Sequence, residues 1–97
     1  MKSVLITYNQ ALSERVMSII DKHGSRGFTQ WELTLGRGTH TGEPHMANHT
    51  WPAMNSTIIT IVEDNRVEKL MNALRELDKD TQMQGLKAYV WNVEDQL

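Results

Sequence analysis

The apolar residues of this chain switch between helical and extended spacing in a fixed order, and this order constrains the fold more than any other feature. Two segments have apolar residues every three or four positions, which is typical of amphipathic helices. The first contains Leu12, Val16, Ile19, Ile20 and His23, and the second contains Val67, Leu70, Met71, Leu74 and Leu77. The spacing therefore predicts two helices, each with one face turned to a core.

Short sequence signals indicate where the two helices begin and end. Gly24 is predicted to end the first helix in a left-handed conformation, with His23 beside the negative end of the helix dipole. Asp64 or Asn65 can cap the second helix, and Asn65 with Glu68 matches a capping box. We expect these polar groups to satisfy the backbone at the helix ends.

Four further segments are rich in β-branched and aromatic residues and predict strands. They cover approximately residues 2–8, 28–35, 56–62 and 86–93. The resulting order, β-α-β-β-α-β, predicts an α+β, ferredoxin-like fold with two helices on one face of a four-stranded antiparallel sheet. The whole chain, residues 1–97, is long enough for a single domain of this kind and too short for two.

The last two predicted strands carry apolar residues on both faces. In the third strand Ile58 and Val62 alternate with Ile59 and Ile61, and in the fourth Trp91 belongs to the set Tyr89, Trp91 and Val93, opposite Leu86, Ala88 and Val90. Two helices cover only one face of a sheet, so a monomer would leave the other apolar face in water. We therefore expect self-association through that face, and the alternative is a monomer with an unusually apolar sheet.

A segment of unusual length and composition, residues 36–55, connects the second and third predicted strands. Connections this long are usually functional or disordered. His40, His45 and His49 lie in it together with Glu43, and Met46 or Met54 could serve as further donors to a transition metal. The sequence thus predicts a divalent or copper-type metal site at His40, Glu43, His45 and His49. The alternative is that these are polar loop residues with ordinary hydrogen bonds.

Charge, cysteine content and motif searches exclude several function classes. A formal charge of −2 without a basic stripe does not suit nucleic-acid binding, and zero cysteines exclude disulfides and thiolate chemistry. Neither a signal-peptide core nor a membrane-spanning run occurs, so we expect a cytoplasmic protein that does not insert into membranes. No nucleophile, phosphate or dinucleotide motif is present, which predicts a protein that is not an enzyme. A small enzyme with a loop histidine as general base is the alternative. Trp51, in the long segment, is the aromatic residue best placed to contact a partner.

Three local runs give the chain a resemblance to a known family. They are Gly27-Phe28-Thr29, Gly36-Arg37 and the stretch Ile61-Val62-Glu63-Asp64-Asn65-Arg66-Val67-Glu68-Lys69. With the element order and the long connection, they resemble the PII signalling superfamily, and more specifically a PII-like protein with its T-loop between strands two and three. The resemblance implies a homotrimer that binds small effectors between subunits and regulates a partner such as a membrane transporter.

The resemblance also implies an adenine-nucleotide site, whose contacts map onto Thr29, Gly36, Arg37, Val62, Gly85 and Lys87. The segment before Lys87 lacks the glycines that cradle phosphates in the family, and no arginine pair follows the last strand. No tyrosine occurs in the long segment, so the tyrosine uridylylation of classical PII proteins is not expected. We therefore expect nucleotide binding that favours few phosphates. The CutA proteins, which are linked to metal tolerance, are a second and weaker resemblance.

Overall fold

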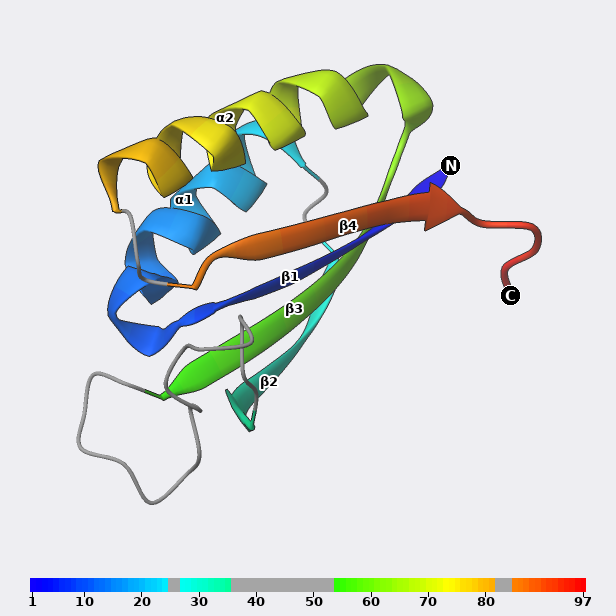
Figure 1. Ribbon diagram of the computed structural model, residues 1–97. Coiled ribbons are helices and arrows are strands. Elements are labelled where there is room, and N and C mark those ends of the chain that lie inside the picture. Colours follow the sequence, from blue (N-terminus) through cyan, green and yellow to red (C-terminus); the bar gives the residue numbers. More distant parts are fainter. Residues whose placement is uncertain (25–26, 36–53, 82–84) are drawn as a thin grey trace.

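Four antiparallel strands form one sheet, and two helices lie together on one of its faces (Figure 1). The structure is a computed structural model that describes residues 1–24, 27–35, 54–81 and 85–97. The strands are β1 (Lys2–Asn9), β2 (Phe28–Thr34), β3 (Asn55–Val62) and β4 (Lys87–Asn92), and the helices are α1 (Ser13–His23) and α2 (Val67–Asp80). The spatial strand order is β2-β3-β1-β4. This is the predicted ferredoxin-like fold, with strand ends within one or two residues of those expected.

The core lies between the helices and the even-numbered residues of the sheet. Successive side chains of a strand point to opposite faces, so one parity of each strand faces the helices. The fully buried or nearly buried apolar residues are Val4, Ile6, Tyr8, Leu12, Val16, Ile20, Ile58, Val62, Leu70, Leu74, Leu77 and Leu86. The Tyr8 hydroxyl keeps a polar partner, because the Gln30 amide donates a hydrogen bond to it at 3.0 Å. The two helical stripes predicted from the sequence are thus confirmed as core.

The end of α1 differs from the prediction. Gly24 has a φ of −102°, so its conformation is not left-handed. Its backbone N–H donates to the Ile20 carbonyl at 2.8 Å, and a Cβ added at Gly24 would lie 3.0 Å from the same oxygen. Glycine fits here because the backbone approaches the helix closely, and not because it needs a positive φ.

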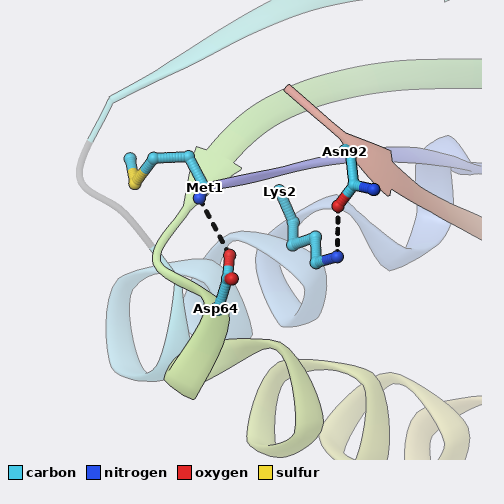
Figure 2. A network of polar contacts seen from close by, with 4 residues as sticks. All are labelled: Met1, Lys2, Asp64 and Asn92. Carbon is cyan, nitrogen blue, oxygen red and sulfur yellow. Dashed lines mark hydrogen bonds and ion pairs between the residues drawn. The ribbon is translucent and has the colours of Figure 1, made fainter. Parts of the chain in front are cut away.

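The predicted capping box at the start of α2 is also wrong. A short 3₁₀ turn, Asp64–Arg66, precedes the helix and places Asn65 outside it. Arg66 then occupies the N-cap position, where no side chain caps the helix. The Asp64 carboxylate instead accepts a contact of 2.8 Å from the amino group of Met1, next to the hydrogen bond from Lys2 to Asn92 (Figure 2). A similar 3₁₀ turn, Gln10–Leu12, leads into α1.

Replacing Asp64 with asparagine tests this ion pair. The amino group lowers the pKa of Asp64 below its ordinary value of 3.8, chiefly through the hydrogen bond and then through its charge. A lowered carboxyl pKa contributes stability that is present at neutral pH and is lost as the pH falls below 3.8 through the pKa of the folded state. We expect Asp64→Asn to melt below the native protein at pH 7 and the difference to vanish near pH 2. Both carboxyl and amino groups are exposed, so the effect is small. A melting difference that persists unchanged at pH 2 would contradict the assignment.

Candidate functional site

The sheet face opposite the helices, here called the open face, carries a broad apolar surface. The odd-numbered residues of β1, β3 and β4 point to it, together with Thr29 and Trp31 of β2, which pair with Ile59 and Thr57. Large side chains are left exposed there, namely Trp31 at 49%, Tyr89 at 55% and Trp91 at 46%. The two-sided apolar pattern of the later strands is therefore confirmed, and this face is a surface that can bind a partner.

Thr29 and Lys87, two of the nucleotide contacts implied by the resemblance, lie on opposite edges of the sheet. Thr29 is an exposed residue of the edge strand β2, where it pairs with Ile59. Lys87 opens the other edge strand, β4, where it is exposed and pairs with Thr7. Three strand spacings separate the two edges, which is about 14 Å. One copy of the chain does not bring these two side chains together.

Val62 lies at a third place, at the end of β3. Its side chain is 1% exposed and belongs to the core, so a ligand could reach only its backbone. Val62 pairs with Lys2, whereas Lys87 pairs with Thr7 near the other end of β1. A hollow of about 350 Å³ adjoins this position and is lined by Met1, Asp21, Gly24, Ile61, Val62, Glu63 and Arg66. The Arg66 guanidinium donates to the Gly24 carbonyl at 3.2 Å, which places a cation beside Val62.

Gly85 has a positive φ of 74°, a conformation that side-chain-bearing residues rarely adopt. It stands just before Leu86, which is 7% exposed and holds this end of β4 against the core. Lys87 therefore follows a turn that is fixed on its far side. The positive φ agrees with a tight approach of the backbone, as a phosphate contact would need.

The remaining predicted site residues lie outside the described part of the chain. They are Gly36 and Arg37 of the nucleotide contacts, His40, Glu43, His45 and His49 of the metal site, and the partner contact Trp51. Within the described residues, no group of three His, Asp or Glu side chains is placed to hold a metal ion. The described helices include none that is long and apolar enough to cross a membrane.

A second hollow, of about 700 Å³, lies on the open face at the end of β4. It is lined by Ser3, Ile59, Ile61, Trp91, Asn92, Val93, Glu94 and Asp95. Sequence reasoning did not single out this hollow, because Ser3 looks like an ordinary strand residue and Glu94 and Asp95 look like a solvated end. Only the pairing of Ser3 with both Ile61 and Trp91 brings these residues together.

The chain belongs to the family of nitrogen regulatory proteins P-II, whose sequence pattern it matches over residues 1–97. Proteins of this family are regulators, which agrees with the absence of catalytic motifs in the sequence. No curated protein matches the chain.

Solved PII-like proteins share this fold. The nitrogen regulatory PII-like protein CPII from Thiomonas intermedia K12, bound to ADP, AMP and bicarbonate, superposes with a TM-score of 0.77 at 20% identity, covering 93% of this chain and 82% of that one. Its apo form gives 0.70 at 17% identity, covering 93% and 85%. A PII-like signalling protein from Thermus thermophilus gives 0.60 at 26% identity, covering 95% and 85%.

Proposed function

We propose that the chain is a homotrimeric PII-like signalling protein that binds an adenine nucleotide between its copies and controls a partner protein, such as a transporter. In this proposal the state of the site is passed on through the long segment, residues 36–55, with Trp51 as a partner contact. The proposal rests on the family, on the apolar open face, and above all on the separation of Thr29 from Lys87.

The separated contacts support a site shared by two copies. In a closed ring each copy uses two different surfaces, one toward each neighbour. A ring can therefore bring the Thr29 edge of one copy to the Lys87 edge of the next. Val62 with the nearby Arg66 would then belong to the first half of the site, and Gly85 with Lys87 to the second. Gly36 and Arg37 are further proposed contacts.

A nucleotide with one or two phosphates suits these residues best. The Thiomonas protein holds ADP and AMP, and its fold is the fold of this chain. Here the segment before Lys87 provides Gly85 as a glycine with positive φ, but not the run of glycines that would wrap a longer phosphate chain. Fewer phosphates need fewer donors, so AMP and ADP lose less than ATP does.

Titration of AMP, ADP and ATP followed by calorimetry tests the nucleotide site. We expect AMP or ADP to bind more tightly than ATP. Removing the Lys87 ammonium deletes a charge-assisted hydrogen bond of about 1.5–3 kcal/mol, so Lys87→Ala should weaken binding by roughly 10- to 150-fold. Lys79→Ala, an exposed lysine of α2, is the matched control and should bind normally. Tight, ATP-selective binding that survives Lys87→Ala would contradict the proposal.

The metal site at His40, Glu43, His45 and His49 is a second candidate, supported by three histidines within ten residues. Metal ligation needs neutral imidazoles, so affinity for zinc, nickel or copper should fall as the pH drops through about 6.5. The triple variant His40→Ala, His45→Ala and His49→Ala should lose binding, while the control His23→Ala in α1 should keep it. Unchanged metal uptake by the triple variant would exclude this function, including a CutA-like role in metal tolerance.

A further inference from the structure

The hollow at the end of β4 contains a buried polar group without a partner. The Ser3 side chain is only 3% exposed, and its hydroxyl oxygen makes no hydrogen bond within the described residues. A buried hydroxyl that lacks a partner costs free energy relative to water. Ser3 lines the hollow on the open face, so a group that enters this hollow can supply the missing partner.

The walls of the hollow indicate the chemistry of that group. Ile59, Ile61 and Trp91 provide an apolar floor, while Glu94 and Asp95 provide two exposed carboxylates at the rim. An apolar floor with an acidic rim suits a methylene chain that ends in a cation. The chain would pack on the aliphatic and indole surfaces, and the cation would lie near the indole face and the carboxylates. An ammonium can also donate to the Ser3 hydroxyl oxygen.

The open face itself offers such a group at its other end. Lys87 is the one charged side chain among the odd-numbered residues of β1, β3 and β4, all of which are described. It is exposed, and it lies at the start of β4, whereas Glu94 and Asp95 follow the end of that strand. One chain cannot fold its own Lys87 into this hollow, because the strand between them is extended and spans roughly 17 Å from Lys87 to Asn92.

We propose that the hollow receives Lys87 of a second copy of the chain. The open face then carries complementary charge at its two ends and an apolar surface between them, so that copies meet with the start of one β4 against the end of the other. The inference rests on the proposed self-association and adds the contact that sets its register. Because the proposed nucleotide also uses Lys87, phosphate and the Glu94 and Asp95 carboxylates compete for one ammonium.

Charge reversal and its rescue test this contact by sedimentation velocity. Lys87→Glu should raise the dissociation constant of the assembly at least about 10-fold, because like charges would then meet at the hollow. Glu94→Lys combined with Asp95→Lys should have a similar effect. Joining all three substitutions in one chain should restore assembly, since every contact again pairs opposite charges. Lys79→Glu on α2 is the control and should assemble as the native protein does.

The outcomes separate this inference from the proposed function. If the native protein assembles and Lys87→Glu assembles equally well, the occupant of the hollow is something else, such as a small amine or a basic partner protein, and the inference is wrong while the trimer stands. Loss of assembly by Lys87→Glu without rescue in the triple variant, with circular dichroism showing a native fold, overturns it as well. A native protein that stays monomeric overturns both proposals, whereas failure to bind nucleotide affects only the proposed function.

Discussion

Leu5→Asp is expected to turn the assembled protein into folded monomers. Leu5 lies on the open face in the central strand β1, flanked by Ile59 and Tyr89 in the neighbouring strands. In a monomer the new carboxylate points to water, so the fold should persist. In the assembly it would be buried without a partner, which costs about 3–5 kcal/mol and raises the dissociation constant roughly 100- to 1000-fold.

Light scattering behind a sizing column measures this effect across a range of protein concentrations. Ser18→Asp is the charge-matched control, because Ser18 is exposed on α1 and faces away from the sheet's open side. It should leave the mass unchanged. A Leu5→Asp variant with the native mass at micromolar concentration would show that copies meet through another surface.

Leu70→Ala is expected to cause the largest loss of stability. Leu70 of α2 is completely buried in the core between the helices and the sheet. Truncation removes its transfer free energy and leaves a cavity, which together cost about 3–4 kcal/mol. Small domains have a total stability of roughly 5–15 kcal/mol, so this is a large fraction of the whole.

Urea unfolding in the Leu5→Asp background measures this loss without a contribution from assembly. Leu97→Ala is the matched control, because Leu97 is fully exposed at the end of the chain. Its unfolding midpoint should stay within the error of the parent. A Leu70→Ala midpoint equal to that of the control would mean that α2 does not pack on the core as described.

Periodicity was sufficient to predict the fold because each element buries one face over several turns or residues. The apolar stripe of α2 recurs at Leu70, Leu74 and Leu77, and β3 has apolar residues on both parities. Helix ends depend on single contacts instead. The role of Gly24 follows from the nearby Ile20 carbonyl, and the position of Asn65 follows from the 3₁₀ turn before α2. Neither contact leaves a repeated pattern that a sequence could display.

The candidate site was harder to predict because it depends on strand order. Thr29 and Lys87 were expected to contribute to one nucleotide site, but the order β2-β3-β1-β4 places them on opposite edges. Likewise, the hollow at Ser3 exists only because β1 pairs with both β3 and β4. Spacing along the chain contains no information on either arrangement.

The two-edged placement of Thr29 and Lys87 also determines how defects combine in mixed assemblies. If each site takes one edge from each of two neighbours, a subunit damaged only at Lys87 disables a single site in its ring. A subunit damaged at both edges disables two. Co-expressing native and doubly damaged chains would thus reduce binding out of proportion to the share of damaged chains, and two singly damaged chains could complement each other by forming an intact site where their sound edges meet.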